Sequence, residues 1–134
     1  MKSQVSIVKC KSYDRGEVGG AVKKSIELLG GINKFIKPGS RVLVKPNLLM
    51  AIEPEKGVTT HPEVVRASVN SLKEINAEII IGDGPSVWGG QVDNIEDVFE
   101  KTGMKAVADE FKVKLVNFDN PRWRNKFPLT KYLD

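Results

Sequence analysis

Three short polar segments hold the residue types that could do chemistry in this chain of 134 residues. Together they offer an ammonium group, an imidazole, a carboxylate and a side-chain amide. Such groups can hold an anionic ligand or move a proton. The segments are Lys45-Pro46-Asn47, Thr59-Thr60-His61 and Gly82-Asp83-Gly84-Pro85-Ser86.

The first segment is suited to binding an anionic group or a cofactor. The ammonium of Lys45 is a compact charge that pairs with phosphate or carboxylate, and Asn47 adds both hydrogen-bond donors and an acceptor. We therefore predict both as ligand-binding residues. The alternative is an ordinary turn that ends a strand, because proline and asparagine are frequent turn residues.

The third segment is rich in glycine. Gly82, Gly84 and Ser86 are predicted to bind an anion or cofactor, because such a loop lets backbone N–H groups approach negative charge. Asp83 is a candidate for proton transfer. The chain has neither a Gly-x-Gly-x-x-Gly nor a Walker pattern, so no nucleotide motif is supported. A plain Gly/Asp turn is the alternative.

The middle segment contains His61, the only histidine of the chain. Thr60 is predicted as a helix N-cap with Glu63 three residues on, which is the pattern of a capping box. A helix N-terminus attracts anions, so His61 is predicted as a catalytic base or ligand, and Thr59 and Thr60 as residues that orient the ligand. The alternative is a capping turn without function. We predict no metal site, because Cys10 and His61 alone cannot supply a zinc ligand set.

Alternating strand and helix patterns surround these segments. Strands are predicted at 5–10, 41–45, 78–81 and 113–118, and helical periodicity or capping signals occupy the stretches between them. The apolar runs at 42–44 and 79–81 are typical of strands covered on both faces. The predicted fold class is α/β: a three-layer, Rossmann-like domain with a mostly parallel sheet of about four strands and helices on both faces.

This fold would bring the polar segments together. In open α/β sheets, ligands bind beyond the carboxyl ends of the strands. Lys45, Asn47 and Asp83 follow two such ends, and Thr60 and His61 begin the helix between them. We therefore expect these five residues at one edge of the sheet.

Bulk composition narrows the class of protein. The length suits one domain, and no apolar stretch approaches the ~20 residues of a membrane span. A single cysteine and the lack of a secretion signal predict a cytoplasmic protein with no membrane partner. The net charge of +4 is typical of a solvated, lysine-rich surface. Nucleic-acid binding through the basic, aromatic segment 122–126 is disfavoured.

The motifs together resemble a known family. Val42-Leu43-Val44-Lys45-Pro46-Asn47-Leu48-Leu49, Thr59-Thr60-His61-Pro62-Glu63-Val64-Val65 and Ile80-Ile81-Gly82-Asp83-Gly84-Pro85, in this order, are similar to the domain-of-unknown-function 362 family over about residues 5–119. Members of that family are often linked to ferredoxin-like iron–sulfur segments, whose Cys-x-x-Cys spacing this chain lacks. The family is also distantly similar to the N-terminal domain of nickel-pincer lactate racemases.

The resemblance implies a division of the chain and two kinds of function. Residues 1–119 resemble the N-terminal half of the family domain, and 120–134 form a basic, aromatic tail or the start of a missing second half. We therefore expect self-association or a requirement for that C-terminal half. The first function is a cofactor- or anion-binding domain, part of a redox or racemase-like enzyme. The alternative is a non-catalytic module that docks to an iron–sulfur or other redox protein. The family has no settled activity, so neither the cofactor nor the reaction is assigned.

Overall fold

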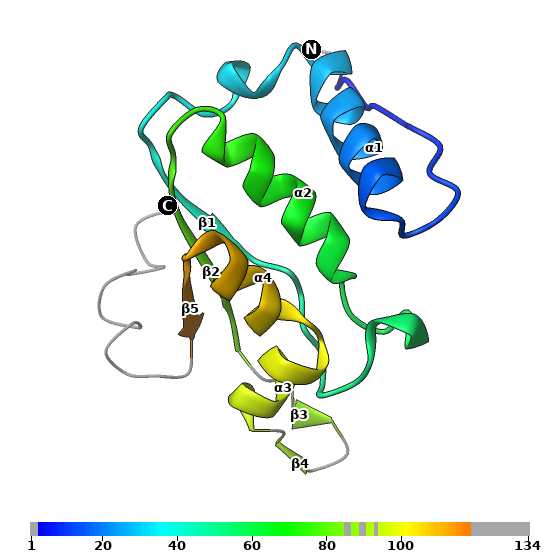
Figure 1. The fold of residues 1–134 in the computed structure, drawn as a ribbon, viewed down its shortest axis with the longest axis vertical. Coiled ribbons are helices and arrows are strands. Elements are labelled where there is room, and N and C mark those ends of the chain that lie inside the picture. Colours follow the sequence, from blue (N-terminus) through cyan, green and yellow to red (C-terminus); the bar gives the residue numbers. More distant parts are fainter. Residues whose placement is uncertain (1–2, 85–86, 89–90, 93, 119–134) are drawn as a thin grey trace.

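A three-stranded parallel sheet forms the centre of the computed structural model, which describes residues 3–84, 87–88, 91–92 and 94–118. The strands are β1 (Arg41–Val44), β2 (Glu78–Asp83) and β5 (Lys114–Asn117), in the order β1-β2-β5. Figure 1 shows the three strands side by side, with Val42 paired with Ile79 and Ile81 paired with Leu115 in the register of the sheet. A separate antiparallel pair, β3 (Val87–Trp88) and β4 (Gln91–Val92), follows β2. The predicted parallel α/β fold is confirmed.

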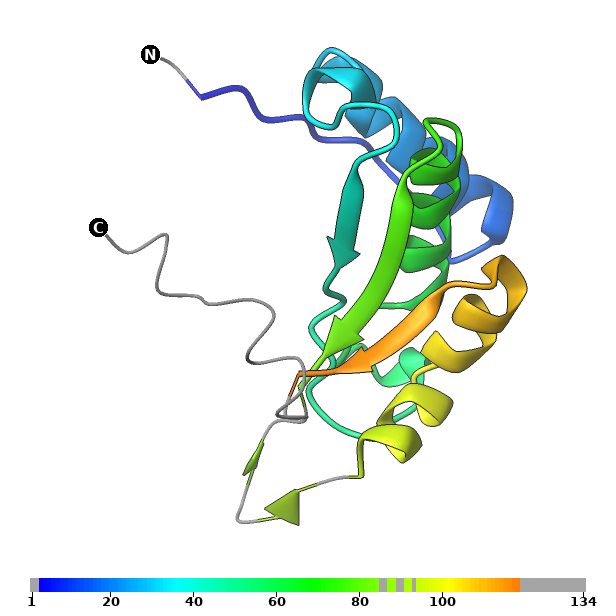
Figure 2. The same ribbon diagram turned by 90° about the vertical axis from the view of Figure 1, so that its left-hand side faces the viewer.

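The helices of the described residues form a single layer on one face of this sheet. Figure 2 shows the four α-helices on the same side of the strands, so the expected second helical layer is not found in the described part of the chain. The elements are α1 (Arg15–Leu28), α2 (Pro62–Lys73), α3 (Ile95–Lys101) and α4 (Met104–Phe111), with short 3₁₀ turns η1 (Ile32–Lys34) and η2 (Pro54–Lys56).

The strand predicted at 5–10 does not join the sheet. Residues 3–10 have no strand assignment, and Val5 and Ile7 are 80% and 90% exposed. Side chains on the alternate positions face the helical layer: Gln4 accepts from Lys34 Nζ at 3.2 Å, and the hydroxyls of Ser6 and Ser25 are 2.6 Å apart. The β-branched pattern therefore predicts an extended conformation here, but sheet pairing also needs a neighbouring strand, and the described residues supply none.

The core lies between the sheet and the helices. The apolar side of α2 packs on alternate residues of β2, as expected for an amphipathic helix covering a pleated strand. α4 packs against β5, and α3 packs against α4. Fully or nearly fully buried members of this core are Val65, Val69, Leu72, Ile79, Ile81, Val98, Phe99, Met104 and Val107.

Local signals explain where the helices begin and end. Asp14 caps α1 by accepting from the N–H groups of Gly16 and Glu17, and Asn94 caps α3 by accepting from Glu96. Gly103, which follows the C-cap residue Thr102 of α3, has a left-handed φ of 76°. None of the helices in the described ranges is long and apolar enough to cross a membrane.

Candidate functional site

Lys45 and Asp83 meet at the carboxyl ends of β1 and β2. Lys45 Nζ lies 2.8 Å from Asp83 Oδ1, and the lysine side chain is 49% exposed whereas the aspartate side chain is 4% exposed. The adjacent parallel strands bring these ends side by side, although the residues are far apart in sequence. The pair joins a buried carboxylate to an ammonium group that solvent and small molecules can reach.

The carboxylate of Asp83 also holds the backbone of both loops. Its Oδ2 accepts from the N–H of Leu48, and its Oδ1 accepts from the N–H of Gly84 at 2.8 Å. Leu48 is itself buried in the core, at 2% exposure. Asp83 thus connects β2 to the loop after β1, which is a positioning role.

Asn47 completes this cluster. It has a left-handed φ of 53°, a conformation that asparagine tolerates better than most residues. Its Oδ1 accepts from Lys45 Nζ at 2.8 Å. The ammonium of Lys45 is therefore held by two acceptors at once, Asn47 and Asp83, and its position is fixed before any ligand arrives.

His61 is the N-cap of α2. Its Nδ1 accepts from the N–H of Glu63 at 3.2 Å, so the predicted N-cap at Thr60 is wrong by one residue. Because Nδ1 uses its lone pair in this bond, a neutral ring carries its proton on Nε2. The imidazole also stacks on Tyr13, with ring centroids 3.8 Å apart. In this arrangement the Nε2–H of His61 is available as a hydrogen-bond donor.

Thr59 stands out among the polar residues before α2. It is 8% exposed, and its Oγ1 has no hydrogen-bond partner in the described structure. Buried hydroxyl groups usually have a partner. Thr60, next to it, is partly exposed.

Local structure explains Gly82 and Gly84 of the third segment without a ligand. A Cβ on Gly82 would lie 2.6 Å from Cε1 of Phe118, so the ring of Phe118 needs this position to be glycine. The N–H of Gly84 is already used by Asp83. Ser86 lies outside the described residues.

The predicted site residues therefore fall into two groups. Lys45, Asn47 and Asp83 are brought into direct contact, whereas no contact joins them to Thr59, Thr60 or His61 among the interactions described above. No group of three or more potential metal-binding side chains occurs in the described ranges.

Sequence reasoning missed a network of charged residues that joins three helices around the buried Arg66. Arg66 of α2, 7% exposed, donates from Nε to both oxygens of Glu63 at 3.0 Å, and its guanidinium pairs with Glu110 of α4. Arg15 of α1 lies 3.6 Å from Glu63 and 3.4 Å from Glu110. The sequence does contain a sign of this network, because Arg66 follows Val65 on the apolar side of α2. A charged side chain that is buried there requires partners of opposite charge.

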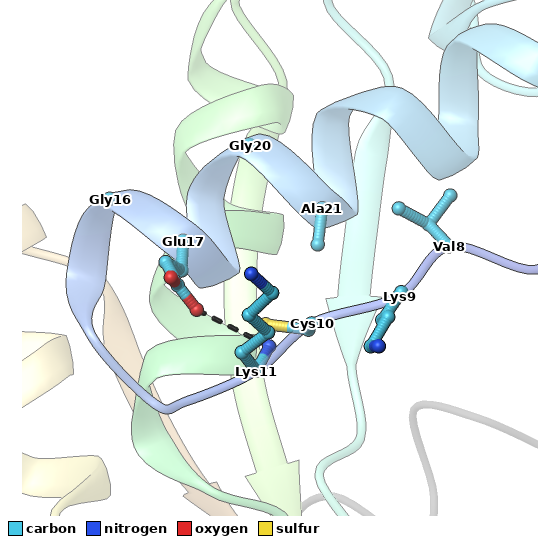
Figure 3. Close-up of a pocket in the computed structure, with 8 residues that line it drawn as sticks. All are labelled: Val8, Lys9, Cys10, Lys11, Gly16, Glu17, Gly20 and Ala21. Carbon is cyan, nitrogen blue, oxygen red and sulfur yellow. Dashed lines mark hydrogen bonds between the residues drawn. The ribbon is translucent and has the colours of Figure 1, made fainter.

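A pocket of about 330 Å³ lies elsewhere, between the N-terminal segment and α1 (Figure 3). One wall contains the exposed thiol of Cys10 with Lys9 and Lys11 on either side. On the opposite wall, Glu17 accepts from the N–H of Lys11 at 3.2 Å and from the Ser12 hydroxyl at 3.1 Å. None of the predicted site residues lines this pocket.

Comparison with known proteins assigns the chain to a family. A curated relative, the thylakoid-associated protein sll1697 of Synechocystis sp. (strain ATCC 27184 / PCC 6803 / Kazusa), is 32% identical over 123 residues. That match covers 92% of this chain but only 37% of the relative. No solved structure matches the chain. Residues 42–134 match the family model described as Domain of unknown function (DUF362), and the chain belongs to this family.

Proposed function

We propose that this chain is the anion- or cofactor-binding part of an α/β protein, with the ligand held beyond the carboxyl ends of β1 and β2. The observation that carries the proposal is the fixed ammonium of Lys45. It is half exposed, yet it is anchored at 2.8 Å from both Asn47 and Asp83. A cation already held in place loses little freedom when it binds a ligand, which favours affinity.

In this proposal, His61 and Thr59 are further candidates to contact the ligand, although no described contact joins them to Lys45. His61 offers its Nε2–H at the start of α2, where the helix dipole also favours negative charge. The Oγ1 of Thr59, which has no partner among the described residues, is a further candidate to contact the ligand. Asp83 acts through Lys45 and the two loops, because both of its oxygens already have partners.

We propose binding of a ligand and assign no reaction to the cluster. A redox or racemase-like activity would require groups beyond those in the cluster, and the chain spans only 37% of the relative that it matches. The alternative is docking to an iron–sulfur or other redox protein through the basic, aromatic tail 120–134, which lies outside the described residues. We expect this chain to act in the cytoplasm, on the ground of its single cysteine; the relative's name places that protein with the thylakoid.

Ligand titration tests the binding proposal. Inorganic phosphate, lactate and AMP are titrated against the purified chain, with heat and melting temperature as readouts. We expect at least one of them to bind, and Lys45→Met to weaken that binding by roughly tenfold or more, as for loss of a charged hydrogen bond. Lys105→Met is the matched control, because Lys105 is 55% exposed and lies on α4.

Two results would overturn the proposal. The first is that none of the three probes binds at millimolar concentration. The second is that Lys45→Met and Lys105→Met bind equally well. Removing Lys45 leaves the buried carboxylate of Asp83 without its cation, which can destabilise the fold. Circular dichroism on each variant therefore checks that the compared proteins are folded.

A further inference from the structure

The helical layer is wider than the sheet that it covers. α1 packs against α2, on the side of α2 away from β5, and Figure 1 shows it beyond the edge of β1. In the described residues β1 pairs only with β2, so its other edge has free backbone N–H and C=O groups. Natural proteins usually cover or pair such an edge.

Apolar side chains border the same edge on the side away from the helices. The register places Leu43 beside Ile80, and neither belongs to the core between sheet and helices. Leu43 is 43% exposed. Val116, at the β5 side of this face, is already buried, so the uncovered part lies toward β1.

The N-terminal segment, residues 3–10, alternates like a β-strand but pairs with no strand among the described residues. Ser6 faces α1 through Ser25, and Val8 lines the pocket on that helix, whereas Val5 and Ile7 point away and are the most exposed large apolar residues described. Figure 2 shows this segment leading away from the helices on the open side of the sheet. Alternation of this kind is typical of a strand with one covered face.

We propose that the free edge of β1, together with Leu43, Val5 and Ile7, is the interaction surface for a further β-strand. Longer members of the family supply that strand from the part of their chain that lies outside the region matched here. Strand addition satisfies the backbone groups of β1, and an apolar strand covers the exposed side chains. The proposal does not depend on the ligand proposed above.

Two observations favour this occupant over a second copy of the chain. Most of the Synechocystis relative lies outside the match, so that protein has polypeptide available to extend the sheet. A second copy would instead bring two chains of net charge +4 together, with the exposed Arg41 on β1 itself. Like charges facing each other oppose association.

The test compares one substitution in two proteins. Leu43→Lys is made in this chain, and the residue aligned with Leu43 is changed to lysine in the full-length Synechocystis protein. We expect the melting temperature of this chain to change by less than about 2 °C, as for a surface substitution. We expect the longer protein to lose about 5 °C or more, because the lysine would lie beside an apolar side chain of the added strand instead of facing water.

Leu28→Lys and its aligned counterpart serve as the matched control. Leu28 is 55% exposed on α1, so the change should be tolerated in both proteins. Equal tolerance of the lysine at position 43 in both proteins overturns the proposal, and so does equal destabilisation, which would mean that Leu43 is covered by its own chain. Light scattering measures the oligomeric state of this chain. If the chain forms a dimer and Leu43→Lys dissociates it, the surface binds a second copy and the proposal is wrong.

Discussion

The phenol ring of Tyr13 lies parallel to the imidazole of His61, with centroids 3.8 Å apart and an angle of 11° between the planes. The stack fixes the loop before α1 against the start of α2. The same imidazole accepts the N–H of Glu63 through Nδ1. His61 therefore stabilises the fold twice, as a helix cap and as a stacking partner, before any role toward a ligand.

The first prediction concerns these two roles. His61→Ala removes the cap and the stack, and we expect it to lower the free energy of unfolding by about 1–3 kcal/mol. His61→Asn keeps a capping oxygen and should lose clearly less. Urea unfolding followed by circular dichroism measures both. A double-mutant cycle with Tyr13→Ala should give a coupling of about 0.5–1.5 kcal/mol; a coupling near zero would show that the rings do not stabilise each other in solution.

The second prediction concerns Asp83. Asp83→Ala leaves the N–H groups of Leu48 and Gly84 without their acceptor and removes the partner of Lys45. Because the site is buried, we expect a loss of about 2–4 kcal/mol in the free energy of unfolding. Denaturant titration measures this loss.

Asp83→Asn is the informative control for charge. Its side-chain oxygen can still accept one of the two N–H groups, so it should be less destabilising than Asp83→Ala. If the two variants unfold at the same denaturant concentration, the ion pair with Lys45 contributes most of the effect and the backbone bonds contribute little.

The fold class was predictable because strand and helix patterns here depend on local sequence. The apolar runs at 42–44 and 79–81 became neighbouring parallel strands, as expected from the alternation with helices. The same reasoning failed for the strand predicted at 5–10. A β-branched sequence specifies an extended backbone, but pairing depends on whether a partner strand is present, and local sequence does not carry that information.

The candidate site was predictable in position more than in chemistry. The carboxyl-end rule placed Lys45, Asn47 and Asp83 together, and the structure brings them into contact. Their hydrogen-bond partners could not be predicted. Leu48 donates to Asp83 from a position 35 residues away, and its donor is a backbone N–H, which every residue except proline has, so residue type gives no sign of the bond. The cap at His61 was missed because Thr60 is the commoner N-cap residue type.

The third prediction contrasts two glycines. A Cβ on Gly20, inside α1, would meet no atom within 4 Å, so Gly20→Ala should raise the free energy of unfolding by about 0.5–1 kcal/mol through better helix propensity. Gly82→Ala should lower it, because the new methyl group would collide with Phe118 and approach the carbonyl oxygen of Val116. Thermal unfolding of both variants decides. An unchanged stability of Gly82→Ala would mean that the Phe118 ring moves aside at little cost.

The last prediction concerns the buried guanidinium of Arg66. Its side chain is 9% exposed and is held between Glu63 and Glu110, so it connects α2 to α4 and, through Arg15, to α1. Arg66→Met keeps most of the apolar stem but leaves Glu63, 17% exposed, with only the long contact to Arg15 among the ion pairs described. We expect a loss of about 2–4 kcal/mol, because a partly buried carboxylate loses its main partner.

Two further variants separate charge from packing at Arg66. Glu110→Gln should cost less than about 1 kcal/mol, because Glu110 is 38% exposed and water can replace the lost contact. Adding Glu63→Gln to Arg66→Met should recover part of the stability, since the more buried of the two carboxylates that Arg66 pairs with is then neutral. Denaturant unfolding of the single and double variants measures the coupling. If Arg66→Met is no worse than Glu110→Gln, the network is not a source of stability, and the apolar contacts of α2 and α4 alone hold the helical layer together.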